Sequence, residues 1–200
     1  EKVRKKMKIS RDTLVIGHVG RFTHDKNQSF LIDIFKAVHD RDKNTVLLLV
    51  GGGEADDTLK NQIRHKVKDL GLEDSVKFLG VREDVEKVVQ AFDVFLLPSL
   101  FEGLPVTMVE QAAGLPCVIS DKVPIQCDIT GNVKVVSLED APEKWAEVID
   151  DVLKNFKKKD TYETIVNAGF DIKENAKWLK DFYVEALKEA GARTPGAMGQ

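Results

Sequence analysis

Short runs of apolar residues alternate along the chain with longer segments in which apolar residues recur every three or four positions. The runs at 14–19 and 45–50 are almost wholly apolar, and a glycine follows each of them at once. Such runs, without alternating polarity, are typical of strands that are buried on both faces. The segment between them, 27–41, carries a stripe of apolar residues with helical spacing and is predicted to form a helix.

The same alternation continues downstream. Strands are predicted at 14–19, 45–50, 75–79, 94–97, 117–120 and 133–136, and helices at 27–41, 57–70, 84–91, 106–113, 142–156, 162–168 and 171–190. Because crossover helices bury both faces of a parallel sheet, the pattern predicts a doubly wound parallel α/β sheet of about six strands with C-terminal helices. The last helix has Trp178 and Phe182 on one face, and we expect this face to cover a sheet edge or to pack on another domain. We expect one domain over 1–190 and a frayed tail over 191–200.

Composition excludes several classes of protein. The 30 basic and 33 acidic residues give a net charge of −3, so no overall positive field is available to attract nucleic acid. No apolar run reaches the roughly 18 residues that cross a bilayer, and the basic N-terminal segment lacks the apolar core of a signal peptide. We therefore expect a cytoplasmic protein. The cations at positions 4, 5, 6 and 8 are expected to form a solvated helix face, with contact to the inner face of an anionic membrane as the alternative.

The cysteines and histidines show no metal-binding arrangement. Cys117 and Cys127 lack zinc-ligand or redox spacing and are expected to be free thiols. The four histidines are scattered along the chain, so no metal site is predicted.

In an open α/β sheet, ligands bind at the carboxyl ends of the strands, so the loops that follow the strands are candidate sites. After the first strand, Gly20 permits close backbone approach, and Arg21 and Lys26 place two cations beside a helix start. This arrangement suits a diphosphate, although a solvated loop would have the same composition. The glycines at 51–53 match neither the dinucleotide-binding motif nor the Walker motif. The backbone groups at 78–82 could contact a nucleobase or could simply form a tight turn.

The loop after the fourth strand carries the strongest signal. Glu102 precedes a predicted helix that begins near Pro105, and Glu110 lies eight positions further along the chain. The helix start is expected to offer free N–H groups from Val106 and Thr107 to an anion. A carboxylate accepts hydrogen bonds from two adjacent hydroxyls, which suits the ribose and the hexose on either side of a diphosphate. The alternative is that Glu102 caps the helix and that Glu110 lies on the surface.

These residues resemble the C-terminal, donor-binding domain of the retaining GT-B glycosyltransferases of glycosyltransferase family 4. The spacing of Glu102 and Glu110 matches that family's Glu-x7-Glu motif, and Gly20-Arg21 with Lys26-Asn27 matches its phosphate-binding loop. Three further blocks match in the same order, at 78–80, 93–99 and 110–116. The resemblance covers about 14–153 and is closest to the bacterial capsular and exopolysaccharide branch.

The resemblance implies a role for each residue of the motifs. Arg21 and Lys26 hold the donor diphosphate and stabilise the departing nucleotide in place of a metal, so no cofactor is expected beyond the nucleotide sugar, which is a co-substrate. Glu102 accepts hydrogen bonds from the donor sugar, and Glu110 binds the ribose. The catalytic set is therefore Glu102, Arg21 and Lys26. The other implied substrate-binding residues are Gly20, Val81, Arg82, Gly103, Leu104, Pro105 and Val106.

The sequence therefore predicts the donor-binding half of a hexosyltransferase-type glycosyltransferase with a Rossmann-like fold. It would move a sugar from a nucleoside-diphosphate sugar, with UDP as the expected nucleotide, to a saccharide or lipid-linked acceptor with retention. The acceptor-binding N-terminal GT-B domain is expected to be absent from this chain, which alone would be inactive or weakly active.

Other function classes fit the sequence less well. The main alternative is a nucleotide-sugar-binding or regulatory module without transfer activity. An epimerase would need further carboxylates, and 123–127 lacks the glutamate that the family often carries there. A dehydrogenase would need a Gly-x-Gly-x-x-Gly after the first strand.

Overall fold

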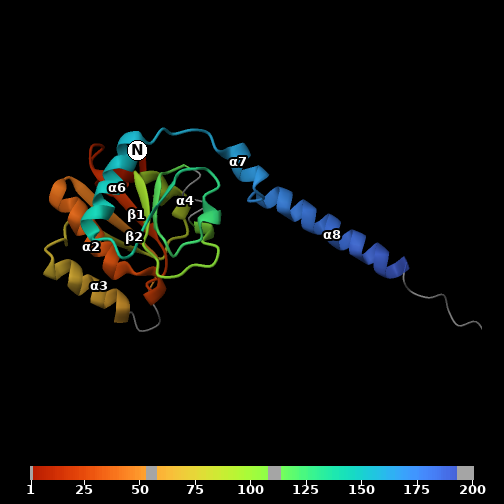
Figure 1. Cartoon of the computed structure of the whole chain (residues 1–200), viewed down its shortest axis with the longest axis horizontal. Coiled ribbons are helices and arrows are strands. Elements are labelled where there is room, and N and C mark those ends of the chain that lie inside the picture. The colour runs from red at the N-terminus through yellow and green to blue at the C-terminus, as the bar shows by residue number, and fades with distance from the viewer. Residues whose placement is uncertain (1, 53–57, 108–113, 193–200) are drawn as a thin grey trace, which may run out of the picture. The chain divides into compact units, whose positions relative to one another are not determined.

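Six parallel strands form the sheet at the centre of residues 1–160 (Figure 1). The computed structural model describes residues 2–52, 58–107 and 114–192. The strands are β1 (Leu14–Val19), β2 (Thr45–Val50), β3 (Val76–Gly80), β4 (Val94–Leu97), β5 (Cys117–Ser120) and β6 (Val133–Val136). Their order in the sheet is β3-β2-β1-β4-β5-β6, and every neighbouring pair is parallel. The predicted doubly wound parallel α/β fold is therefore confirmed.

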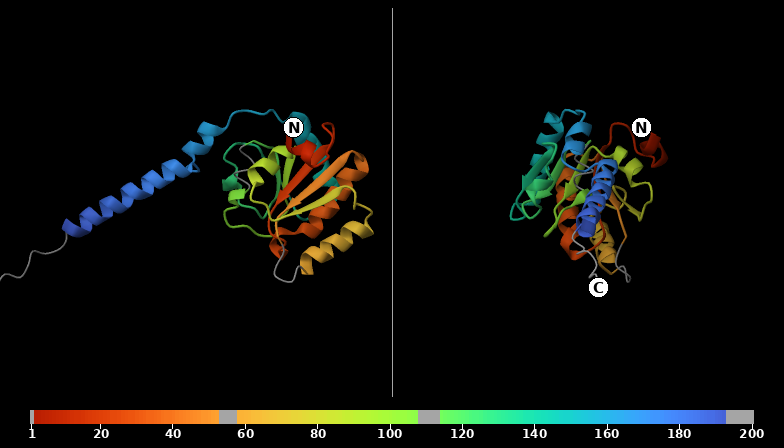
Figure 2. Two further views of the ribbon diagram at one scale, coloured as in Figure 1. Left: turned by 180° about the vertical axis from the view of Figure 1, so that it is seen from behind. Right: turned by 90° about the vertical axis from the view of Figure 1, so that its right-hand side faces the viewer.

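Helices connect the strands. The helices of the described residues are α1 (Lys2–Lys6), α2 (Gln28–Arg41), α3 (Thr58–Asp69), α4 (Val85–Val88), α6 (Pro142–Asn155), α7 (Tyr162–Asn167) and α8 (Ile172–Ala192), with 3-10 turns η1 (His24–Lys26), η2 (Val89–Ala91) and η3 (Ile125–Cys127). Helix α2 packs against both α3 and α6 on one face of the sheet, while α1 lies beside η2 on the other face (Figure 2). This two-sided cover explains why β4 is apolar throughout and why β2 and β5 each have only one polar residue, Thr45 and Ser120, at an end of the strand.

The core lies between the sheet and the layer of α2, α3 and α6. Trp145 of α6 is its largest fully buried side chain. The indole packs edge-on against Phe30 of α2, with ring centroids 5.8 Å apart, and its Nε1 donates to Ser137 O at 3.0 Å. One residue therefore joins α6, α2 and the segment after β6, and it keeps its only polar atom hydrogen-bonded.

Two predicted segments differ from the structure. The helix predicted at 84–91 is shorter, because the chain tightens into the 3-10 turn η2, where Phe92 N donates to Val89 O. The N-terminal cations do not all form a solvated face. Arg4 donates to Ala91 O and Thr13 O and pairs with Asp93 at 2.7 Å, so it fastens α1 to the amino edge of the sheet.

Residues 161–200 form a second unit, described here through residue 192. Helix α8 carries an apolar stripe whose side chains stack along the helix itself, with Trp178 and Phe182 ring centroids 5.5 Å apart. Within this unit Trp178 is 66% exposed, and Phe182 and Leu187 are exposed as well. No helix among the described residues is both long enough and apolar enough to span a bilayer.

The two tryptophans of the chain provide a matched test of the core. Trp145→Ala is expected to lower the free energy of unfolding by about 3–5 kcal/mol, because it leaves a cavity and an unpaired Ser137 carbonyl. Trp178→Ala removes the same side chain from an exposed position and is expected to change that free energy by less than about 0.5 kcal/mol. Urea unfolding followed by far-UV circular dichroism measures both. Equal effects would show that α6 does not anchor the core.

Candidate functional site

The strand order changes direction between β1 and β4, and the loops that follow these two strands meet at the carboxyl edge of the sheet. Leu100 N donates to Asp25 O at 2.7 Å, and Asn27 Nδ2 donates to Pro98 O at 3.2 Å. Such a switch point is where ligands bind in open α/β sheets, because the loops on its two sides diverge and leave a crevice. The two loops that the sequence marks as most informative are the two that the topology brings together.

The charged centre of this edge is an ion pair between Lys26 and Glu102. Lys26 Nζ lies 2.5 Å from Glu102 Oε1, and Ser99 Oγ donates to the same oxygen at 2.6 Å. The Glu102 side chain is only 9% exposed and that of Lys26 only 20%. Arg21 is exposed, and it pairs with no carboxylate among the residues that the structure describes. The site thus holds one neutralised cation and one cation available to an anion.

Glycines bring the loops after β1 and β2 into backbone contact. Gly20 N donates to Val50 O at 2.9 Å, and Phe22 N donates to Gly52 O at 2.8 Å. Gly51 has φ +142°, and a Cβ added there would lie 1.9 Å from Gly20 O. Only glycine fits at position 51, so the glycines after β2 serve to seat the loop that carries the cations.

The segment after β3 lies next along the same edge. Val81 is 80% exposed, and a Cβ added at Gly52 would come within 2.8 Å of Val81 Cγ2. The guanidinium of Arg82 turns to Asp84, with Nε and Nη2 each 2.9 Å from a carboxylate oxygen. The proposed contact of this segment with a nucleobase stays a prediction.

The start of the helix after β4 corrects one expectation. Val106 and Thr107 are helical, but Val106 N donates to Leu104 O at 2.9 Å and is not free for an anion. Gly103 and Leu104 are exposed beside Glu102, whereas Pro105 is buried. Glu110 lies outside the described residues, so its predicted role at the ribose is not placed here.

Sequence reasoning missed a buried polar pair beneath the site. His18, on β1, is 1% exposed, and its Nδ1 lies 2.9 Å from Leu96 O. Because a carbonyl only accepts, Nδ1 carries the proton and Nε2 is left as an acceptor, 3.5 Å from Gln28 Nε2. Gln28 Nε2 also donates to Arg21 O at 2.6 Å, so the pair supports the cation-bearing loop from below. The feature of the sequence that could have indicated this pair is a histidine within the otherwise apolar run at 14–19.

Burial decides the ionisation of the titratable groups around the sheet. It lowers the pKa of His18 to about 4, against the opposing effect of the Leu96 carbonyl. Burial also raises the pKa of both cysteine thiols, Cys117 well above its usual value. Both cysteines are free thiols, as predicted, and both are buried. Neither is ionised near neutral pH.

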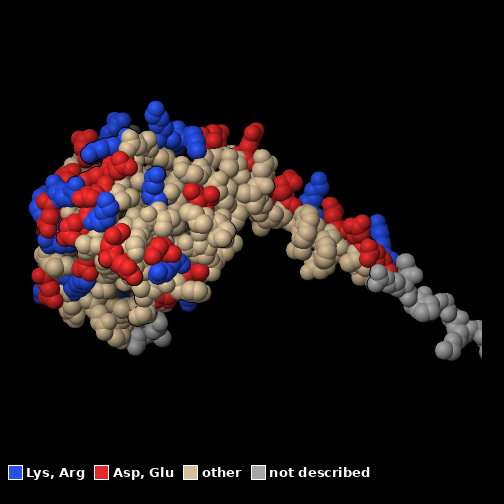
Figure 3. All heavy atoms as spheres, viewed as in Figure 1, with Lys and Arg blue, Asp and Glu red and all other residues tan. Residues whose placement is uncertain are grey.

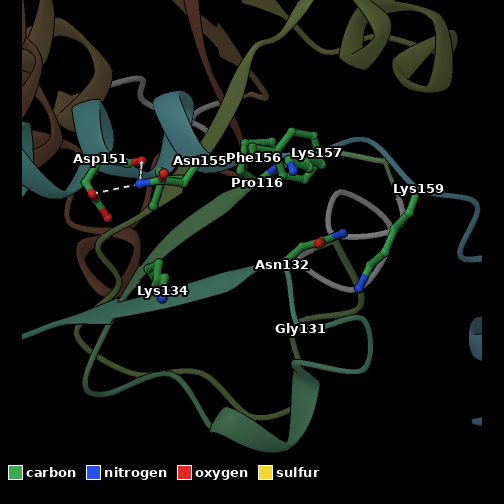
Figure 4. A pocket seen from close by; sticks show the side chains of 10 residues that line it. Pro116, Gly131, Asn132, Lys134, Asp151, Asn155, Phe156, Lys157 and Lys159 are labelled. Carbon is green, nitrogen blue, oxygen red and sulfur yellow. Dashed lines mark hydrogen bonds between the residues drawn. The ribbon is translucent and has the colours of Figure 1, made fainter.

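A separate cavity of about 460 Å³ lies at the opposite, amino edge of the sheet (Figure 4). Pro116 and Asn132, which precede β5 and β6, line it together with the end of α6 and Lys159. The side chains of Asn132 and Lys159 point toward one another, and Asp151 and Asn155 are hydrogen-bonded to each other. The cavity contains none of the predicted site residues.

Charge is distributed unevenly over the surface. On the face seen in Figure 3, cations and carboxylates alternate over α2 and α3, while few charges lie on the side of the segments drawn in green in Figure 1. The loop after β4 contributes exposed apolar residues instead, among them Phe101 and Leu104. The ion pair of Lys26 and Glu102 is therefore bordered by apolar surface, which is typical of a binding site.

Comparison of the sequence with known proteins gives one family. Residues 1–169 match the family described as "Glycosyl transferases group 1". The chain is 37% identical over 179 residues to a putative glycosyltransferase, EpsF, of Bacillus subtilis (strain 168), covering 88% of this chain and 46% of that protein. It is 29% identical over 188 residues to a UDP-Gal:alpha-D-GlcNAc-diphosphoundecaprenol alpha-1,3-galactosyltransferase of Escherichia coli, covering 90% and 47%. The chain thus spans about half the length of these relatives.

Solved structures share the fold. Sucrose-phosphate synthase from Thermosynechococcus elongatus superposes with a TM-score of 0.77 at 23% identity, covering 94% of this chain and 49% of that one. Anabaena Alr3699/HepE in complex with UDP superposes with a TM-score of 0.75 at 22% identity, covering 92% and 52%. At this level of identity the likeness concerns the fold alone, and it matches the Rossmann-like half of a GT-B protein.

The buried histidine makes stability depend on pH. The pKa of His18 is about 4 in the folded chain and 6.5 in the unfolded chain, so the unfolded chain binds the proton more tightly. The contribution of neutral His18 is complete above pH 6.5 and is lost as the pH falls from 6.5 toward 4. Between pH 7 and pH 5 the loss amounts to roughly 2 kcal/mol.

Urea unfolding at pH 7 and pH 5 measures this loss. His18→Gln is expected to have a smaller drop in the free energy of unfolding than the wild type, because glutamine does not titrate. His65→Gln, at an exposed position on α3, serves as the control and should follow the wild type. Equal drops in wild type and His18→Gln would contradict a neutral buried histidine.

Proposed function

This chain belongs to the group 1 glycosyl transferases, and we propose that it is the donor-binding half of an enzyme that moves a sugar from a UDP-sugar. The acceptor is a saccharide or a lipid-linked saccharide, and the anomeric configuration is retained. The observation that carries this proposal is the meeting of Lys26 and Glu102, 2.5 Å apart, at the switch point of the sheet. The E. coli relative is named for a UDP-galactose donor, and a HepE structure holds UDP-glucose.

In this proposal each loop at the carboxyl edge binds one part of the donor. Arg21 and Lys26 bind the diphosphate and stabilise the charge on the departing nucleotide, so that no metal is needed. Glu102 accepts hydrogen bonds from the sugar hydroxyls, and the exposed backbone at Gly103 and Leu104 borders the sugar. The nucleoside lies toward the segment after β3, where Val81 and Arg82 contact the base and Glu110 binds the ribose.

The acceptor half of the cleft belongs to a further part of the parent enzyme. The relatives are about twice as long as this chain, and the apolar stripe of α8 gives such a part a surface on which to pack. In this proposal the reaction takes place in the cytoplasm. The enzyme contacts the membrane only through a lipid-linked acceptor. By itself the chain binds donor and turns over little, because half of the reacting geometry is missing.

Isothermal titration of the 200-residue chain with UDP, GDP and ADP tests the proposal. We expect saturable binding of UDP, and we expect Arg21→Gln to weaken it about tenfold, since a charge-assisted contact to phosphate contributes about 1.5–3 kcal/mol. Arg11→Gln removes an exposed arginine at the opposite edge of the sheet and should leave the affinity unchanged.

A second variant tests the part of the site that the structure does not describe. Glu110→Ala is expected to lower the affinity for UDP about tenfold, because it removes the hydrogen bonds to the ribose hydroxyls. If no nucleotide binds below millimolar concentration, the proposed function is wrong. If UDP binds and Glu110→Ala leaves its affinity unchanged, the role of Glu110 is wrong.

A further inference from the structure

Two different donors share one oxygen of Glu102. Lys26 Nζ lies 2.5 Å and Ser99 Oγ 2.6 Å from Oε1, and no described residue donates to Oε2. Glu102 is therefore paired in this structure with the cation that the proposed function assigns to the donor diphosphate. Lys26 cannot give its full charge to both anions at once, so donor binding has to alter this contact.

Ser99 is the donor that cannot move away. It is fully buried, and its carbonyl accepts from Ser120 Oγ at 2.5 Å. Its two neighbours in the chain, Pro98 and Leu100, are hydrogen-bonded to the loop after β1. The hydroxyl of Ser99 thus has a fixed position beneath the carboxylate of Glu102, three residues further along the chain.

Lys26 has the freedom that Ser99 lacks. Its ammonium lies on a flexible four-carbon stem, and its side chain is 20% exposed. It is the last residue of η1, and one residue separates it from α2, whose N-terminal end attracts anions. The exposed Arg21 lies on the same loop. A diphosphate that binds Arg21 offers Lys26 several charged oxygens in place of one carboxylate oxygen.

We propose that Lys26 is the exchangeable partner and Ser99 the fixed partner of Glu102, so that a nucleotide diphosphate draws Lys26 away and leaves Glu102 oriented toward the donor sugar. Ser99 is then a positioning residue, which acts through Glu102. The exchange couples the two halves of the donor, because the carboxylate becomes available to sugar hydroxyls only when the diphosphate has taken the ammonium. This inference rests on the proposed function and adds to it an order of contacts within the site.

A double-mutant cycle on UDP affinity tests the exchange. Isothermal titration compares the wild-type chain with Glu102→Gln, Lys26→Met and the double variant. In the wild-type background, Glu102→Gln is expected to raise the affinity for UDP about fivefold, because Lys26 no longer has to leave a carboxylate. In the Lys26→Met background, the same substitution is expected to change the affinity for UDP by less than about twofold. Lys36→Met removes a half-buried lysine of α2 that pairs with Asp40, and this control should leave UDP affinity unchanged.

The other outcomes are distinguishable. If Glu102→Gln raises the affinity for UDP equally in both backgrounds, the inference is overturned. Such a result would show that the carboxylate only repels the diphosphate, independently of Lys26. No gain in either background overturns it as well. If the wild-type chain does not bind UDP at all, the proposed function itself fails and the inference fails with it.

Ser99→Ala tests the fixed partner with UDP and UDP-galactose or UDP-glucose as probes. The affinity of this variant for UDP is expected to stay within about twofold of the wild-type value. Its affinity for the UDP-sugar is expected to fall about fivefold relative to its affinity for UDP, because no hydrogen bond then orients Glu102 once Lys26 has left. A role in packing alone would instead weaken both ligands alike. That result, or an unchanged ratio of the two affinities, overturns the assignment.

Discussion

The contact between the loop after β1 and the loop after β4 determines where this chain can do chemistry. Parallel strands have all their carboxyl ends at one edge, and the sheet reverses its order between these two strands. One backbone hydrogen bond, one hydrogen bond from the Asn27 side chain and the pair of Lys26 with Glu102 close the junction. The other features of the edge, including the glycine contact between Gly20 and Gly51, position the cation-bearing loop against this junction.

The junction is supported by polar groups inside an otherwise apolar core. Neutral His18 and Gln28 hold the backbone of Arg21 from below, and Ser120 holds Ser99. Buried polar groups of this kind fix geometry only while each keeps its partner. The buried pair of His18 and Gln28 therefore belongs both to the core of the sheet and to the support of the cation-bearing loop.

The strands and helices could be predicted from the sequence because the spacing of apolar residues within a segment shows which of its positions are buried. A strand covered on both faces is almost wholly apolar, so the runs at 14–19, 45–50, 94–97 and 117–120 coincide with observed strands. The run at 133–136 coincides as well, although two residues of this edge strand are exposed. The third strand is displaced by one residue, and the helix at 84–91 is divided, because its last turn tightens into a 3-10 turn. Such end effects depend on neighbouring hydrogen bonds, which no apolar pattern records.

The sequence by itself determined the fold class, the free state of Cys117 and Cys127, and the family resemblance, since these follow from residue types and their spacing. Only the tertiary structure decided which side chains meet. Lys26 and Glu102 are 76 positions apart, and strand order, not spacing, places them 2.5 Å from each other. The same holds for Arg4 bound to Asp93. Each depends on a hydrogen-bond partner that the folded chain supplies and the linear pattern does not name.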